Sequence, residues 1–292
     1  MVPALDDPKN QWAFCPSLPA AAFMAALFGL TTLFHTYQAI RFRKWYCVVI
    51  IMGGSLETLA MISRSLSIQY PTSEALYAIW FVLVLVSPLW INAFVYMIMG
   101  RMVYNFIPTQ KIGRIPARRF GLYFVLLDVL SFIIQVAGAV QAVGNNLSAT
   151  QLLRGIHIYM GGVGLQQFFI IIFMILAIQF HRDLRRQQST SRIASAWRML
   201  YVIYAVLILI TARIIFRLVE YSSGFTSTIP NHEAYMYCLD SLPMLTALVM
   251  LNIVHPGAVM PGKESDLPSR KERKSREQMY TTPESMDLEA TR

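Results

Sequence analysis

Charged residues are scarce in this sequence. Asp, Glu, Lys and Arg together make up 14% of its 292 residues, whereas hydrophobic residues make up 55%. Soluble domains carry about 25% charged residues, so this composition excludes an ordinary soluble enzyme. The apolar residues gather in runs of roughly 20, which is the length of an α-helix that crosses a bilayer. We therefore predict an all-α, polytopic membrane protein.

Motifs of several enzyme classes are also absent. No Gly-x-x-x-x-Gly-Lys-Ser/Thr loop is present, so the chain does not hydrolyse ATP by that route. A membrane metallohydrolase needs clustered metal ligands, but the histidines form no His-Glu-x-x-His or His-x-x-x-His pair. We therefore predict no enzymatic activity, no cofactor and no metal site, and we keep the metallohydrolase as the least favoured alternative.

Seven apolar runs divide the chain. Residues 1–17 precede them and lack the basic start of a cleavable signal peptide, so we expect the first run to stay in the membrane. Residues 18–257 form one predicted seven-helix domain. Residues 258–292 are charged and show no apolar periodicity, so we predict that they form a disordered tail. The predicted helices span about 18–40, 45–68, 75–103, 120–143, 155–180, 199–221 and 233–254.

Basic residues are distributed unevenly among the loops. Lys and Arg cluster after the first, third, fifth and seventh helices, and almost none follow the second, fourth and sixth. The positive-inside rule then places the N-terminus outside and the C-terminus in the cytoplasm. Asn146 begins a glycosylation sequon on the predicted outer side. We expect the basic loops to face anionic lipids of the inner leaflet, not nucleic acid.

Charged and amide side chains interrupt the apolar runs. Arg213, Arg217 and Glu220 follow one another at spacings of four and three residues, so they share one helix face. Charges within a bilayer are costly without partners and by default mark a functional interior. Two explanations stay open: a structural salt-bridge network, or a polar cavity that receives the headgroup of an amphiphile. The candidate substrate-binding residues are Glu57, Arg64, Asp128, Gln135, Gln166, Arg213, Arg217, Glu220, Glu233 and Asp240.

Some of these positions demand partners on other helices. Glu57 and Arg64 lie seven residues apart on one helix, too far for a direct salt bridge, so each needs a neighbouring helix. Pro88 has no N–H and leaves one carbonyl of its helix without a backbone bond, which a buried neighbour or a water must satisfy. The glycines within 161–164 predict a close approach of helices, with a packing role.

The last two apolar runs carry a resemblance to a known family. The pattern Arg213-Ile-Ile-Phe-Arg217-Leu-Val-Glu220, followed by Glu233, Asp240 and His255-Pro-Gly, resembles the fungal lipid-translocating exporters. The founding member of that family is named for resistance to aminocholesterol, and the similarity spans essentially all seven runs. In the second run Ala60 and Met61 stand where the family has Gly-Tyr.

The resemblance implies residence in a fungal plasma membrane or endomembrane. It also implies that the protein moves sphingoid bases, sterol-like amines or related toxic lipids and confers resistance to them. A seven-helix lipid sensor or receptor, which signals through its cytoplasmic loops and tail, is the alternative. The sequence leaves the oligomeric state open.

Overall fold

The computed structural model describes residues 10–12, 14–142, 148–187, 191–222 and 232–268. Within these residues, seven helices are long and apolar enough to cross a membrane, which confirms the predicted all-α membrane class. The predicted glycosylation site Asn146 and the tail after residue 268 lie outside the described residues. The continuous spans are α1 (Leu18–Phe42), α2 (Val48–Gln69), α3 (Glu74–Phe106), α4 (Ala117–Gln141), α5 (Ala149–Arg185) and α6 (Ser191–Ser222).

The seventh span is divided. It consists of α7 (Glu233–Met236), the π-helix η2 (Tyr237–Ser241) and α8 (Leu242–Ile253). The short elements outside the spans are η1 (Trp45–Cys47), β1 (Lys111–Ile112), β2 (Ile115–Pro116), α9 (Pro256–Val259) and η3 (Lys263–Ser265). The antiparallel β1–β2 hairpin was not predicted, because two-residue strands are too short to show an alternating pattern.

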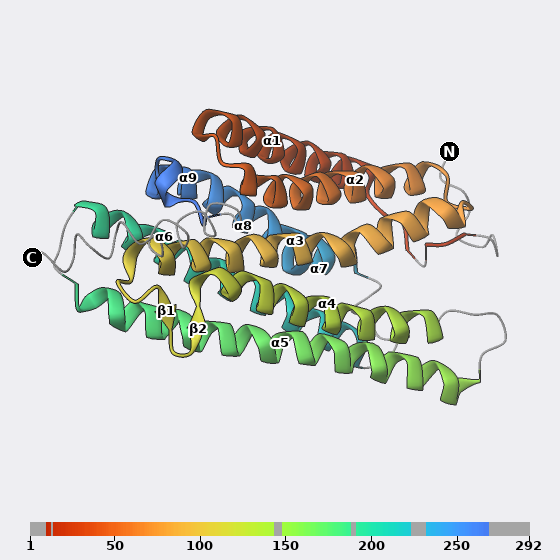
Figure 1. Cartoon of the computed structure of the whole chain (residues 1–292). Helices are drawn as coiled ribbons and strands as arrows, with labels where there is room; N and C mark the ends of the chain where they lie inside the picture. Colours follow the sequence, from red (N-terminus) through yellow and green to blue (C-terminus); the bar gives the residue numbers. More distant parts are fainter. Residues whose placement is uncertain (1–9, 13, 143–147, 188–190, 223–231, 269–292) are drawn as a thin grey trace, which may run out of the picture.

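The helices form one bundle in which neighbours in sequence are neighbours in space. Each of α1 to α6 packs against the next, α8 packs against both α6 and α1, and α3 also contacts α6 and α5. The chain enters α1 at one end of the bundle and leaves α9 at the other (Figure 1). The polar residues of α3, α4, α5 and α6 can therefore meet inside the bundle.

Serine side chains define the starts of several helices. Ser17 accepts a hydrogen bond from the N–H of Ala20 at the start of α1, and Ser73 caps α3 in the same way. Ser148 and Gln151 form a capping box that begins α5 at residue 149. The helix therefore starts before the predicted residue 155, since hydropathy marks only its apolar part.

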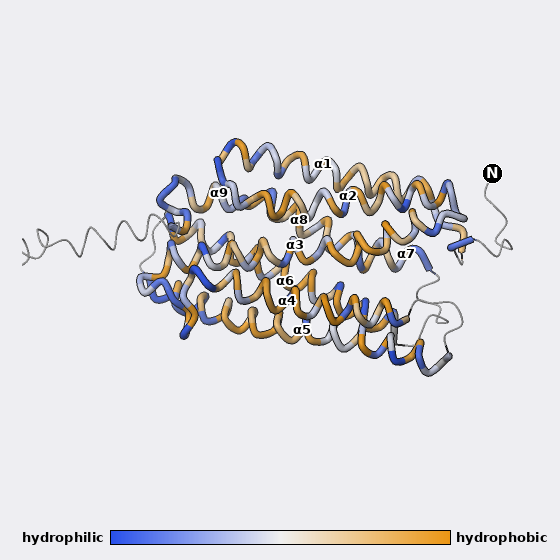
Figure 2. Tube along the Cα trace, turned by 45° about the vertical axis from the view of Figure 1, so that its right-hand side comes forward, coloured by the Kyte–Doolittle hydropathy of each residue, from blue (hydrophilic) through white to orange (hydrophobic). Residues whose placement is uncertain are grey.

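The outer surface of the bundle is apolar along its length. Hydrophobic residues occupy the middle of the helices and hydrophilic residues gather at the two ends (Figure 2). Leu33, Ile133 and Ile208 are each more than half exposed. Such a surface is suited to lipid rather than water, because lipid tails solvate apolar side chains without cost.

Glycines bring α4 and α5 together. A Cβ at Gly138 would lie 2.7 Å from the carbonyl oxygen of Gly155, and a Cβ at Gly162 would lie 2.8 Å from the backbone of α4. Gly161 and Gly164 have nothing within 4 Å. Of the glycines predicted to allow close helix approach, Gly162 therefore does so and the other two do not.

The first residues after α9 are packed against the end of the bundle. Lys44, only 2% exposed, donates from Nζ to Gly262 O at 2.7 Å, to Ser265 Oγ at 2.8 Å and to Asp266 Oδ1 at 2.9 Å. Asn105 Nδ2 donates to Ser265 O at 2.9 Å. Lys44 belongs to a predicted basic loop, but its charge is used within the protein.

Candidate functional site

Two arginines of α6 and two acids form a buried ion-pair cluster. Arg213 Nε lies 2.6 Å from Asp240 Oδ1, and Arg217 Nη2 lies 2.7 Å from Asp240 Oδ2. Arg217 Nη1 also donates to Glu220 Oε2 at 3.0 Å. We call these four side chains the central cluster; they are at most 10% exposed, and their formal charges cancel. The predicted common face of Arg213, Arg217 and Glu220 is confirmed.

The π-helix η2 carries Asp240 into this cluster. Pro243, in the first turn of α8, has no N–H to donate to the carbonyl of Leu239, so an α-helical bond is missing there. The preceding turn is widened into a π-helix, a feature that occurs frequently at functional sites. Pro243 is the sequence signal for this irregular turn.

The proline within α3 provides another contact of the cluster. Val84 precedes Pro88 by four residues, so its carbonyl has no helical donor. Arg213 Nη2 donates to this carbonyl at 3.0 Å. The prediction that a buried neighbour must satisfy the carbonyl freed by Pro88 is confirmed, and the neighbour is an arginine that ties α6 to α3.

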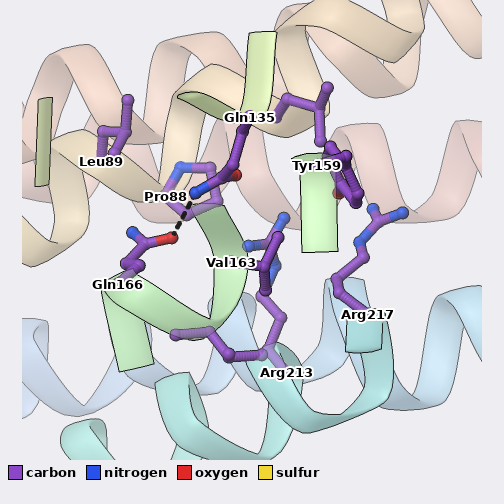
Figure 3. Close-up of a pocket in the computed structure, with 10 residues that line it drawn as sticks. Pro88, Leu89, Gln135, Tyr159, Val163, Gln166, Arg213 and Arg217 are labelled. Atoms are coloured by element: carbon purple, nitrogen blue, oxygen red, sulfur yellow. Dashed lines mark hydrogen bonds between the residues drawn. The ribbon is translucent and has the colours of Figure 1, made fainter. Parts of the chain in front are cut away.

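Two glutamines face the arginines across a small cavity. Gln135 Nε2 on α4 donates to Gln166 Oε1 on α5 at 3.1 Å, and Figure 3 shows both amides beside Arg213 and Arg217. The enclosed volume is about 20 Å³, roughly enough for one water molecule. The remaining residues that line it are Leu85, Pro88, Leu89, Tyr159, Val163 and Ile214.

Two further predicted acids are held by neutral donors. Ser87 Oγ donates to Glu57 Oε1 at 2.7 Å, which gives Glu57 its expected partner on a neighbouring helix. Asn92 Nδ2 and Tyr96 OH donate to Asp128 Oδ2 at 3.0 and 3.1 Å. Neither acid forms an ion pair with any residue that the structure describes.

Arg64 and Glu233 form a second cluster near the start of α1. Arg64 Nη2 donates to Glu233 Oε1 at 2.9 Å, and the N–H of Ser17 donates to Glu233 Oε2 at 2.8 Å. The Arg64 guanidinium carbon lies 4.6 Å from the ring centres of Trp12 and Trp80, and 5.3 Å from that of Tyr237. Arg64 thus has the partner that its position required.

The aromatic box around Arg64 was missed from the sequence. Tyr77 and Trp80 are three residues apart on one face of α3, and their rings pack against each other. Trp12 comes from the polar segment before α1 and packs against both. The signals were a tryptophan in a polar segment and an aromatic pair at helical spacing, both also typical of ordinary packing.

The candidate residues therefore divide between two places. Six of them meet at the central cluster and its cavity: Gln135, Gln166, Arg213, Arg217, Glu220 and Asp240. Glu57 and Asp128 lie on the adjoining helices. Arg64 and Glu233 lie apart, in the second cluster. Among the described residues, no group of three or more His, Cys, Asp or Glu is placed to hold a metal ion.

Comparisons with known proteins agree with this picture. The "Probable lipid transporter atnI" of Emericella nidulans is 42% identical over 270 residues, which cover 88% of this chain and 70% of that protein. "Protoporphyrin uptake protein 1" of Saccharomyces cerevisiae is 32% identical over 205 residues (69% and 65%). The yeast "Sphingoid long-chain base transporter RSB1" is 22% identical over 289 residues (87% and 75%).

No solved structure matches the chain. The family model described as "RTA1 like protein" matches residues 50–263, a range that contains every candidate substrate-binding residue. The resemblance to the fungal lipid-translocating exporters is confirmed by this match and by the relatives. The chain belongs to the RTA1-like family of membrane proteins.

Proposed function

We propose that this integral membrane protein binds amphiphilic lipids with a cationic headgroup at the central cluster and translocates them, so that it confers resistance to toxic lipids. Sphingoid bases and sterol-like amines are the proposed substrates, and the plasma membrane is the proposed location. The observation that carries the proposal is a buried, charge-balanced cluster beside a polar cavity within the membrane spans. The names of two relatives, a lipid transporter and a sphingoid base transporter, support it.

The chemistry of the cluster suits an exchange of cations. Asp240 is shared by Arg213 and Arg217, so a lipid ammonium group can replace one arginine while the other stays. The displaced arginine can then contact a phosphate or hydroxyl of the headgroup. Packing alone does not require such a cluster, because polar contacts between membrane helices contribute only about 0.6 kcal/mol on average.

The cavity must widen before a headgroup can occupy it. Its volume is about 20 Å³, whereas pockets for small molecules enclose roughly 300–1,000 Å³. Two helices around the cavity have irregular points at which they can bend: α3 at Pro88, which lines the cavity, and the seventh span at the π-helix η2, which carries Asp240. We therefore propose that α3 and the seventh span bend at these points to open the cavity to one membrane face at a time.

The direction of opening follows from the proposed orientation. With the N-terminus outside, as the loop charges predict, the start of α1 lies at the outer face. The Arg64 cluster contacts Ser17 there, so it lies between the outer face and the central cluster. It is the proposed outer recognition point. Arg64 already fills the aromatic box, so a lipid ammonium would contact Glu233 while the Arg64 guanidinium contacts a phosphate or hydroxyl of the headgroup.

The test is movement of a labelled sphingoid base across liposomes that contain only the purified protein. Movement above that in protein-free liposomes is expected, and Arg217→Ala should abolish it. The matched control is Arg186→Ala, which removes an arginine that is 83% exposed and paired only loosely with Asp183.

Two results would contradict the proposal in different ways. Equal movement by wild type and Arg217→Ala would remove the central cluster from the path of the lipid. Saturable binding of the lipid without any movement would instead favour the sensor or receptor alternative.

A further inference from the structure

Asp128 differs from the other buried acids in its surroundings. Its helix, α4, packs against α3 and α5, and the groups that face its carboxyl are Asn92 and Tyr96 from α3 and Gln166 from α5. Tyr96 is the only one of them that can ionise. Asp128 is 2% exposed, and its second oxygen, Oδ1, accepts no hydrogen bond from the described residues.

Two of the other buried acids are paired with arginines. Asp240 and Glu220 form ion pairs, and Glu57 is close enough to Arg213 for an electrostatic interaction. Among the described residues, no Lys, Arg or His lies within ion-pair distance of Asp128. A carboxylate buried without a cation is costly, whereas a carboxyl group that carries a proton needs no cation. These surroundings suit a group that takes up and releases a proton.

A continuous polar route joins Asp128 to the central cluster. The Gln166 side chain lies close enough to the Asp128 carboxyl to affect it electrostatically, and Gln166 Oε1 accepts a hydrogen bond from Gln135 at 3.1 Å. Both glutamines line the cavity that Arg213 and Arg217 also line (Figure 3). A change of charge at Asp128 can therefore alter the hydrogen bonds at the edge of the cation site. In the same way, binding of a cation at the central cluster can alter the affinity of Asp128 for a proton.

We propose that Asp128 is a proton-binding site coupled to the lipid site, so that a proton gradient drives lipid movement. This inference rests on the proposed function. In each cycle one proton from water on one side binds the Asp128 carboxylate and leaves to water on the other side, while one lipid ammonium crosses in the opposite direction. One positive charge crosses each way, so the exchange is electroneutral and responds to a pH gradient but not to a membrane voltage.

The experiment uses the full chain in liposomes with a labelled, N-trimethylated sphingoid base. An ordinary sphingoid base can lose its proton and cross the bilayer as a neutral amine, so its distribution would follow the pH gradient without any protein. The trimethylated probe keeps its positive charge and cannot cross in this way. A gradient of about one pH unit should shift the steady-state ratio of probe between leaflets by about tenfold, because one proton exchanges for one cation. Asp128→Asn should bind the probe but lose this shift.

A matched control distinguishes loss of the Asp128 carboxyl group from the effect of any substitution on this face of α4. Ser131 lies one turn from Asp128 on the same face of α4, is fully buried, and donates only to the carbonyl of Leu127 on its own helix. Ser131→Ala should therefore keep the gradient response. The proposal would be overturned if Asp128→Asn kept the full response to the pH gradient. It would also be overturned if the wild type moved the probe at a leaflet ratio that did not depend on the pH gradient.

Infrared spectroscopy distinguishes a failure of this inference from a failure of the proposed function. Wild type should show the C=O band of a protonated carboxyl group whose intensity changes when the probe binds, and Asp128→Asn should lack that band. Absence of such a band in the wild type would overturn the proton site, whatever the transport assay shows. A third outcome is that the wild type shows the band, but the probe neither binds nor moves and its addition leaves the band unchanged. That outcome would contradict both the coupling and the proposed function.

Discussion

Replacement of Asp240 by asparagine should strongly destabilise the protein, because it upsets the charge balance of the central cluster. The wild-type cluster holds Arg213 and Arg217 against Asp240 and Glu220, all at most 10% exposed. Asp240→Asn leaves two buried arginines with one acid. Removal of one partner from a buried ion pair costs about 3–5 kcal/mol. At roughly 2–4 °C per kcal/mol, this lowers Tm by roughly 6–20 °C.

The assay is thermal unfolding of the purified protein together with a double-mutant cycle. Arg213→Gln should destabilise the protein by a similar amount, and it also leaves the Val84 carbonyl without its donor. In the double variant one arginine again faces one acid. Its total cost should therefore fall short of the sum of the single variants by roughly 1–3 kcal/mol.

The control for this prediction is the replacement of an acid in a partly exposed ion pair. Asp183→Asn makes the same chemical change in an acid that is 31% exposed and whose partner, Arg186, is 83% exposed and 3.8 Å away, so it should cost no more than about 1 kcal/mol. Strictly additive effects of Asp240→Asn and Arg213→Gln would refute the reasoning, because additivity means that the two side chains do not interact.

Three further predictions concern other parts of the bundle. Gly138→Ala should destabilise the protein by about 1–3 kcal/mol, since its Cβ would meet the backbone of α5, whereas Gly161→Ala, with nothing within 4 Å, should be neutral in the same thermal assay. Lys44→Ala should raise hydrogen exchange in residues 262–266, which it now holds by three bonds; unchanged exchange would show that other contacts suffice. Arg64→Lys loses the planar fork that binds Glu233 and stacks between the rings, so sphingoid base affinity should fall several-fold in a binding titration; wild-type affinity would exclude the second cluster from recognition.

Helical periodicity explains which parts of the site could be predicted. Arg213, Arg217 and Glu220 lie on one helix, so their spacing alone places them on one face. Pro88 likewise requires a partner for the carbonyl four residues before it. Neither rule identifies the partner, because the approach of Asp240 depends on how the seventh span packs against α6.

Features that arise from tertiary contacts could not be predicted from these patterns. Lys44 looks like a residue of a basic loop, and only the folded position of Asp266 shows that its charge is internal. Trp12 belongs to a polar segment, and its role appears only when that segment packs against Arg64. In both cases the decisive neighbour is far away in the sequence.

The geometry of the central cluster also indicates which arginine yields to a ligand. Arg213 forms an ion pair with Asp240 and donates a hydrogen bond to the Val84 carbonyl of α3, so its departure would leave a buried carbonyl without a donor. Arg217 donates to both oxygens of Asp240, at 3.2 and 2.7 Å, and also to Glu220 one turn away on its own helix. A lipid ammonium can take over the two contacts with Asp240 while Arg217 keeps its ion pair with Glu220. In the proposed function we therefore expect a lipid ammonium to replace Arg217 at less cost than Arg213. This difference gives the two arginines separate parts in the proposed cycle: Arg213 holds α3 and α6 together, and Arg217 exchanges with the substrate.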